Sequence, residues 1–294
     1  MYYLLSLFSG ALTALMIVSN GKLSAATGLN SATLLIHITG LLTISFILLL
    51  KRENPFAKRN RIFLYLGGVI GVATTVMNNL VFGQISLSAI VALGLLGQSL
   101  TSIIIDQFGL FQRPKNPLQK KQFFGLFIIF AGILSMVKDF RPLPVILSVV
   151  IGFTLVISRI FNARLSLETS TYTSTFFNYF TGLLCASPVF LLFGRSESFY
   201  LHPVLPQNPF YYLGAVLSVV VVFLASFIIN KISTLFSTLF MFIGQLFFGM
   251  VLDILLSHSF QKETLFGGLL VSIGLFFYLL YAKDNKQISR ESSL

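Results

Sequence analysis

Leu96-Gly97-Gln98 is followed eight residues later by Asp106, and 147 residues further along the chain Ile243-Gly244-Gln245 is followed by Asp253 at the same spacing. Outward from these two stretches, more of the sequence repeats. Tyr65-Leu66-Gly67-Gly68-Val69 recurs as Tyr212-Leu213-Gly214-Ala215-Val216 at the same shift, and Asn20-Gly21-Lys22-Leu23-Ser24 resembles Asn162-Ala163-Arg164-Leu165-Ser166 at a shift of 142. Matches that keep one order along the chain indicate an internal repeat.

The composition is that of a membrane protein. Hydrophobic residues make up 55% of the 294 residues and charged residues only 10%, well below the quarter that is usual in soluble domains. The mean hydropathy is +0.88. We therefore expect a polytopic protein made only of α-helices, because helices satisfy every backbone polar group inside a bilayer.

Apolar runs between charged or turn-rich breaks predict ten transmembrane helices, each near the roughly 20 residues that cross a bilayer. The fifth is short, and its place in the repeat is what supports it. The predicted spans are Tyr2–Ser19, Leu29–Leu50, Ile62–Phe82, Leu87–Ile105, Phe123–Val137, Val145–Phe161, Thr171–Phe193, Phe210–Asn230, Ser233–Leu256 and Leu265–Tyr281.

An odd number of spans in each repeat makes the two copies enter the membrane from opposite faces. The sequence thus predicts two inverted-topology repeats of five helices, an arrangement known among secondary transporters. The first repeat covers residues 1–140. The second covers residues 141–294 and ends in a short cytoplasmic tail.

Orientation follows from the basic residues, which favour cytoplasmic segments. Of the 20 Lys and Arg residues, fifteen fall on the side of the two termini in this topology. Both termini are therefore expected in the cytoplasm. The same distribution accounts for the net charge of +11 without a nucleic-acid partner. The five on the other side are Lys22, Lys138, Arg141, Arg195 and Lys262.

Polar side chains at membrane depth are costly unless they are paired, and they are the candidates for substrate binding. Gln98 and Gln245 lie near the middle of the fourth and ninth spans. His37 lies midway along the second span and could carry a proton, although its repeat mate Tyr179 favours simple hydrogen bonding. The other candidates are Asn178, Asn78 and Asn79.

Four further residues are candidates for gating or for structural roles. Inversion puts Asp106 at the cytoplasmic end of its helix and Asp253 at the external end of its own. A helix-end Asp is more often solvated or structural than functional. Asn20 and Asn162 follow the first predicted span of each repeat, and their plain interpretation is a turn or a helix cap.

Several kinds of chemistry are missing from the sequence. There is no P-loop, no HExxH motif and no Cys/His cluster, and Cys185 is the single cysteine, so we expect no cofactor, no metal and no enzymatic activity. None of the predicted spans carries Asp, Glu, Lys or Arg at its centre. This pattern disfavours a multiply charged substrate.

The repeated motifs resemble those of the YdcZ-type family in the drug/metabolite transporter superfamily. The resemblance rests on Asn162-Ala163-Arg164-Leu165 with its weaker copy at 20–23, and on Gln98 and Asp106-Gln107-Phe108-Gly109-Leu110 with the copy Gln245…Asp253. After Asp253 the second copy departs from the pattern. The resemblance covers nearly the whole chain in its fused, two-repeat form. It implies an exporter of small molecules in the inner membrane of a bacterium.

The leading hypothesis is a secondary transporter that moves a small, neutral or singly charged metabolite or drug by alternating access. The alternative is a lipid flippase or scramblase, because an inverted pair could carry a headgroup across the midplane. The expected partners are the small-molecule substrate and the lipid bilayer, and the protein could act as a monomer or a homodimer.

Overall fold

The computed structural model describes residues 1–57, 60–85, 87–113, 115–135, 141–202, 205–257 and 262–291. Within these ranges the chain forms helices and no β-strand. The helices are α1 (Tyr2–Thr27), α2 (Leu29–Lys51), η1 (Ile62–Tyr65), α3 (Leu66–Val81), α4 (Leu87–Phe108), η2 (Leu110–Gln112), α5 (Gln122–Ser135), α6 (Pro142–Glu168), α7 (Thr171–Phe193), α8 (Ser198–Leu201), α9 (Phe210–Ile229), α10 (Thr234–Ser257) and α11 (Lys262–Glu291).

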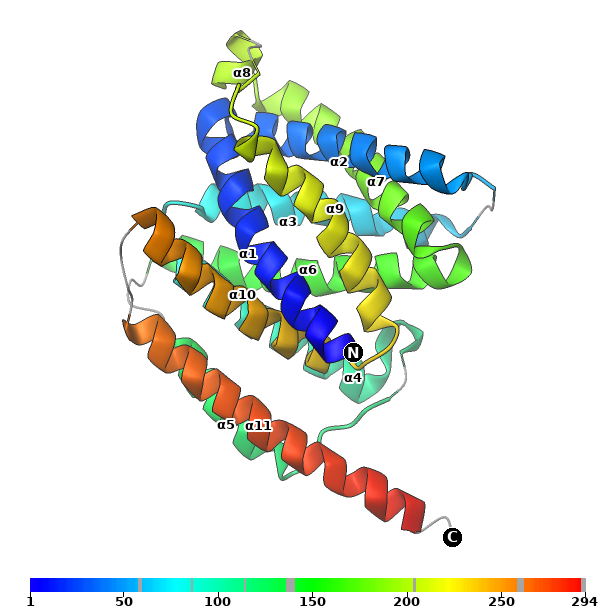
Figure 1. Ribbon diagram of the computed structural model, residues 1–294, viewed down its shortest axis with the longest axis vertical. Helices are drawn as coiled ribbons and strands as arrows, with labels where there is room; N and C mark the ends of the chain where they lie inside the picture. Colours follow the sequence, from blue (N-terminus) through cyan, green and yellow to red (C-terminus); the bar gives the residue numbers. More distant parts are fainter. Residues whose placement is uncertain are drawn as a thin grey trace.

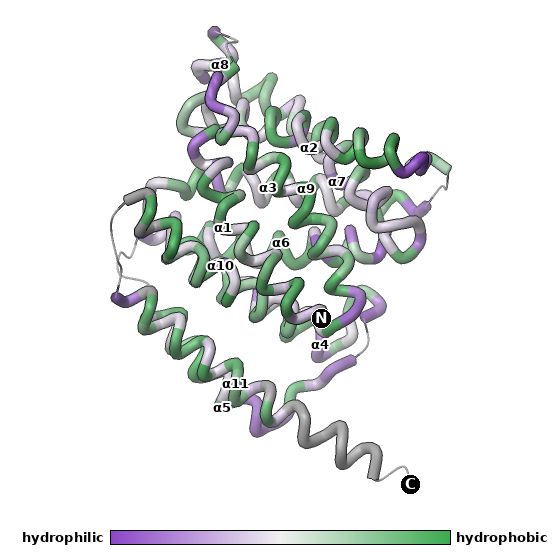
Figure 2. The backbone as a smooth tube through the Cα atoms, viewed as in Figure 1, coloured by the Kyte–Doolittle hydropathy of each residue, from purple (hydrophilic) through white to green (hydrophobic). Residues whose placement is uncertain are grey.

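Eight of the described helices are long and apolar enough to cross a membrane: α1, α2, α3 with η1, α4, α6, α7, α9 and α10. Two shorter apolar stretches, in α5 and in residues 265–278 of α11, complete the set. Hydrophobic residues run along the helices, and hydrophilic residues gather at helix ends and loops (Figure 2). The prediction of an all-α polytopic membrane protein is confirmed, with eight candidate membrane-spanning helices among the described residues. The count of ten stays a prediction.

Helices far apart in the sequence pack side by side in pairs that correspond under the repeat (Figure 1). In one half of the bundle α4 and α3 pack on α6. In the other half their mates α10 and α9 pack on α1, which is the mate of α6. The mates α2 and α7 pack on each other, and so do α5 and α11. The helix pairing is therefore the one expected of two related units.

The close contacts inside these pairs repeat residue by residue. On α4 and α6, a methyl group added at Gly152 would overlap the backbone oxygen of Gly94. On their mates α10 and α1, a methyl group at Gly10 would overlap the backbone oxygen of Met241. Gly10 and Met241 are related to Gly152 and Gly94 by the sequence shifts of 142 and 147. The absence of a side chain lets both helix pairs approach to backbone contact.

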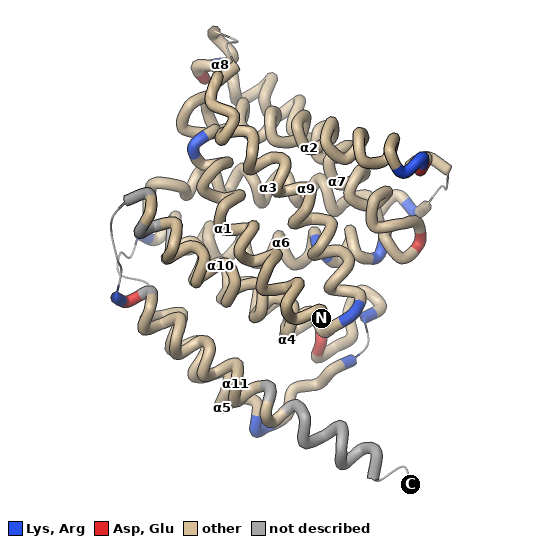
Figure 3. Tube along the Cα trace, viewed as in Figure 1, with Lys and Arg blue, Asp and Glu red and all other residues tan. Residues whose placement is uncertain are grey.

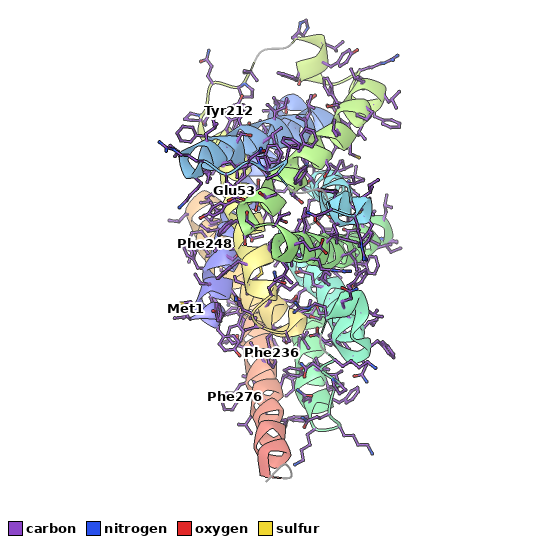
Figure 4. The ribbon with its side chains drawn as sticks, turned by 90° about the vertical axis from the view of Figure 1, so that its right-hand side faces the viewer. Met1, Glu53, Tyr212, Phe236, Phe248 and Phe276 are labelled. Carbon is purple, nitrogen blue, oxygen red and sulfur yellow. The ribbon has the colours of Figure 1, made fainter. Side chains whose placement is uncertain are left out.

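Two helices begin against a carboxylate supplied by the loop that follows their repeat mate. Glu197, after α7, accepts hydrogen bonds from Asn30 and Ser31 at the start of α2. Glu53, after α2, accepts from Ser170 and Thr173 at the start of α7 (Figure 4). Negative charge at a helix N-terminus is stabilising because it meets unpaired N–H groups and the positive end of the helix dipole. The paired caps hold α2 and α7 together at both ends.

The helices α5 and α11 form a separate layer beside α4 and α10 (Figure 1). Their buried side chains share one apolar cluster with α4 and α10, which includes Ile129 and Tyr278. Phe276 points away from α11 and is exposed (Figure 4). This layer therefore contacts the rest of the bundle along one face only.

Two helices are longer than the hydropathy pattern predicts. α1 continues to Thr27 and α6 to Glu168, past the predicted ends at Ser19 and Phe161. Asn20 and Asn162 therefore lie inside helices, and their interpretation as turn or cap residues is wrong. Apolar runs end at the first polar side chains, but here Asn20 and Asn162 are buried within the bundle and the helices continue past them.

Lys and Arg lie mainly at helix ends (Figure 3). The start of α1 packs against the end of α9, where the Tyr2 and Phe227 ring centroids lie 6.0 Å apart. The Lys231 ammonium lies 6.0 Å from the same Phe227 ring. The amino terminus thus shares an end of the bundle with a basic residue that the predicted topology assigns to the same side.

Candidate functional site

A cavity of about 150 Å³ lies between the eight long helices. Each of them contributes lining residues, four helices from each half of the chain, whereas no described residue of α5 or α11 does. Of the ten candidate residues named from the sequence, seven line this cavity: Asn20, His37, Asn78, Gln98, Asn162, Asn178 and Gln245. The cavity therefore joins polar residues from both repeats.

Gln98, on α4, shares the cavity with a charged residue that the sequence analysis did not place there. Nη1 of Arg159, on α6, donates to Oε1 of Gln98 at 3.0 Å. Arg159 lies four residues beyond the middle of α6, or about 6 Å along the axis. The sequence analysis therefore missed a charged side chain that lines the cavity. The residue stands inside the predicted span Val145–Phe161, but it was counted as a basic residue at a cytoplasmic helix end.

Gln245, the repeat mate of Gln98, lines the opposite half of the cavity on α10. The residue that corresponds to Arg159 in the first repeat is Ile17, which also lines the cavity. The two glutamines thus occupy equivalent positions, but the residue beside Gln98 is Arg159 and the equivalent residue in the first repeat is Ile17. One half of the cavity carries a cation, and the other half carries an apolar side chain at the same place.

Asn162 and Asn178 form a buried pair beside the cavity. Nδ2 of Asn162 donates to Oδ1 of Asn178 at 2.8 Å, and the Ser174 hydroxyl donates to the backbone oxygen of Asn162 at 2.5 Å. A methyl group at Gly67 would overlap Oδ1 of Asn162. These contacts tie α6 to α3 and α7. Asn162 is therefore a contact between helices that also faces the cavity.

Asn20 occupies the equivalent place in the first repeat, where a methyl group at Gly214 would overlap its Oδ1. Its neighbour Ser19 donates to the backbone oxygen of Phe210 and accepts from the N–H of Gly214, the latter at 2.8 Å. Oδ1 of Asn20 is buried and has no hydrogen-bond partner among the described residues. Asn20 therefore lines the cavity, while its unpaired Oδ1 is buried against Gly214 on α9.

His37 lines the cavity and is 3% exposed. Its Nδ1 lies 2.8 Å from the backbone oxygen of Thr33, one turn back in α2, so Nδ1 carries a proton in this contact because a carbonyl can only accept. A methyl group at Gly182 would meet the ring at Cδ2 and Nε2. Tyr179, the repeat mate, donates from its hydroxyl to Ser218 at 2.7 Å. Both positions thus hold ring side chains in hydrogen bonds.

Asn78 and Asn79 point in different directions. Asn78 lines the cavity and donates to the backbone oxygen of Thr74 at 3.1 Å. Asn79 is not among the lining residues, and its Nδ2 lies 3.4 Å from Oγ1 of Thr33 on α2. Successive residues on a helix are about 100° apart, and Asn79 is turned toward α2. The structure does not bring Asn79 to the candidate site.

Asp106 lies away from the cavity, at the end of α4, and is 5% exposed. Its carboxylate accepts from the N–H of Leu235 in the first turn of α10 at 3.1 Å. Arg113 donates to the backbone oxygen of Ile232 at 3.0 Å. Burial lowers the pKa of Arg113, and the charge of Asp106 acts in the opposite direction. These contacts hold the start of α10, which is a structural role. Asp253 lies in α10, and its side chain is outside the described part of the structure.

A second pocket of about 710 Å³ lies at this end of the bundle. Its charged lining residues are the basic Arg113, Lys115, Arg164 and Lys231 and the acidic Asp106 and Glu168. Arg164 lies five residues after Arg159 on α6 and donates to Oε1 of Gln112 at 2.7 Å. The pocket thus has more basic than acidic side chains, near the end of α6 that carries Arg159.

The cavity wall has two chemical characters. The polar part includes Arg159, Gln98, Gln245 and the four asparagines at 20, 78, 162 and 178, and the apolar part includes Met16, Ile17, Ile36, Ile90, Val91, Val221 and Val222. Such a mixture suits an organic molecule with one polar end. Among the described residues, no group of three His, Cys, Asp or Glu side chains could hold a metal ion.

Comparisons with known proteins agree with this architecture. The model of a family described as "Putative inner membrane exporter, YdcZ" matches the chain twice, over residues 1–135 and 143–277. No curated protein matches it in sequence. A solved structure described only as a crystal structure of a protein is similar in fold, with a TM-score of 0.70 and 15% sequence identity. The similarity covers 96% of this chain and 98% of the other.

Proposed function

Because the chain belongs to the YdcZ family of inner membrane exporters through both of its repeats, we propose that it is a secondary transporter for a small metabolite or drug. It would move this substrate across the inner membrane of a bacterium by alternating access. One observation carries the proposal above the others. A single cavity is lined by four equivalent helices from each repeat, as expected for a site at a repeat interface.

The proposal includes the full topology. Each repeat supplies five spans, with α5 and α11 as the short fifth members and a boundary near residue 140. Both termini face the cytoplasm, because the predicted loops on that side hold fifteen of the 20 basic residues. In this arrangement α5 and α11 support the bundle from one side and take no part in binding.

Substrate binding is assigned to side chains that face the cavity. Gln98 and Gln245 contribute one amide from each repeat, and Asn178, Asn78 and His37 add further polar contacts. A cavity of about 150 Å³ matches a molecule of about benzene's size. In this conformation the cavity therefore suits a small substrate. Asp106 is assigned to the stability of the α4–α10 contact.

Flux through purified protein in liposomes tests the proposal. Liposomes loaded with each of a broad panel of labelled small metabolites, with and without ion gradients, should show exchange or efflux of at least one. The same preparation given fluorescent phospholipids separates this activity from the lipid flippase alternative. Lipid movement together with no metabolite flux under any gradient would overturn the proposal.

A further inference from the structure

Arg159 brings a positive charge into a cavity whose described lining residues include no carboxylate. Within the described part of the structure, its guanidinium donates to the neutral amide of Gln98. A cation inside a membrane protein is costly unless it is paired, and it usually faces a pathway or a partner charge. The cavity therefore lacks one negative group.

We propose that the substrate supplies this group: the cavity binds a small organic monoanion, a carboxylate with a compact apolar body, and Arg159 holds the carboxylate. The proposal rests on the transport function proposed above and names its substrate class. A guanidinium offers five donors in a planar fork that fits a carboxylate through two parallel hydrogen bonds. One donation to Gln98 leaves the other N–H donors of the guanidinium for the anion.

Gln98 completes the anion site. Because its Oε1 accepts from Arg159, the amide nitrogen is turned away from the guanidinium and keeps its donors for the ligand. Gln98 therefore has two effects: it fixes the orientation of the arginine and adds a neutral donor next to it. A neutral partner leaves the charge of Arg159 uncompensated, whereas a Glu at position 98 would neutralise it.

The asymmetry of the repeats limits the ligand to one negative group. Ile17 stands where the first repeat would otherwise carry a second cation, and the residues Val221 and Val222 add to the apolar wall. This wall can bury the hydrocarbon part of the ligand. A dianion would leave one charge without a partner, and an organic cation would be repelled by Arg159.

The pocket near the end of α6 favours the same sign of charge. Its four basic and two acidic lining residues give a positive balance, which raises the local concentration of anions. In the proposed orientation this pocket opens on the cytoplasmic side, where an exporter collects its substrate. This second observation is independent of the contacts inside the cavity.

Ligand-induced thermal stabilisation of the full chain in nanodiscs tests the inference. The probes are benzoate, its neutral isostere benzamide and the cation benzylammonium, with isobutyrate and isobutyramide as a smaller pair. We expect stabilisation by one or both carboxylates and by neither amide nor the amine. Arg159→Gln should weaken carboxylate binding roughly 10- to 100-fold, the range of a lost charged hydrogen bond, and Arg159→Lys should retain part of it.

The matched control is Arg195→Gln, which removes one positive charge from an exposed side chain that donates to the backbone oxygen of Leu191, near the end of α7. It should bind like the wild type. The inference is overturned if an amide or the amine binds as tightly as the corresponding carboxylate. It is also overturned if neither carboxylate binds at millimolar concentration, or if the folded Arg159→Gln variant responds to carboxylates like the wild type. Carboxylate binding without any flux in liposomes would instead contradict the proposed transport function and leave the anion site standing.

Discussion

The guanidinium of Arg159 on α6 donates to the side-chain oxygen of Gln98 on α4 at 3.0 Å, inside the cavity that both repeats line. This bond joins two helices that also meet at backbone distance through Gly152 and Gly94. The arginine is therefore held on a rigid pair of helices. Its repeat-related position is occupied by Ile17, so the charge belongs to one half of a nearly symmetric site.

The different surroundings of the two glutamines predict different effects of the same substitution. Gln98→Glu places a carboxylate beside Arg159, and the resulting ion pair should compete with an anionic ligand and weaken its binding roughly 10- to 100-fold. Gln245→Glu places a carboxylate where the equivalent neighbour is Ile17, so it gives Arg159 no such partner. Benzoate titrations of both variants by thermal shift check this. Equal losses in the two variants would contradict a special role for the Arg159–Gln98 pair.

Backbone contact between α4 and α6 predicts a large stability effect from a single methyl group. Gly152→Ala would overlap the backbone oxygen of Gly94, and we expect it to destabilise the fold by about 1–3 kcal/mol, as overpacking does. Gly249→Ala is the control, because the nearest atom to its added methyl lies 4.0 Å away. Thermal unfolding in detergent measures both. A melting temperature for Gly152→Ala no lower than that of Gly249→Ala would show that the two helices are further apart.

The carboxylate of Glu197 predicts a contribution to stability far from the cavity. It accepts four hydrogen bonds from Asn30 and Ser31, at 2.6 to 2.9 Å. Glu197→Ala should lower stability by about 1–3 kcal/mol, because it leaves the donors at the start of α2 without their charged acceptor. Arg195→Ala, in the same loop, should have little effect. Both changes are measured by thermal unfolding of the purified variants, and similar melting temperatures would remove this role of Glu197.

The positions of the basic residues predict the orientation. Green fluorescent protein fused after Leu294 should be fluorescent, because it folds in the cytoplasm, and alkaline phosphatase at the same place should be inactive. Fusions in the segment between α7 and α9 should show the opposite pattern. An active phosphatase at the carboxyl terminus would reverse the proposed topology.

The repeat in the sequence predicts much of the fold, because each equivalent pair of motifs forms an equivalent contact. Gly67 meets Asn162, and Gly214 meets Asn20 in the same way. The repeat also brings Gln98 and Gln245 to one cavity. These positions could be found because packing between repeated helices preserves spacing.

Arg159 could not be placed from hydropathy, because that pattern compares each residue with lipid and takes no account of a polar cavity. For the same reason, hydropathy predicted ends for α1 and α6 that are too early and placed Asn20 and Asn162 outside their helices. Asn79 was included because it stands next to Asn78, and the sequence did not show that its amide meets Thr33 on α2. The one available signal for Arg159 was its place before Ile160 and Phe161, within an apolar run.

The most direct test of a central cavity that opens to alternate sides is the accessibility of a single cysteine within it. Met16 lines the cavity and is partly exposed, so Met16→Cys in a Cys185→Ser background gives one reactive thiol. We expect a membrane-impermeant thiol reagent to label it in both right-side-out and inside-out vesicles, and benzoate to slow the labelling from both sides. Labelling from one side only, or from neither, would contradict alternating access through this cavity.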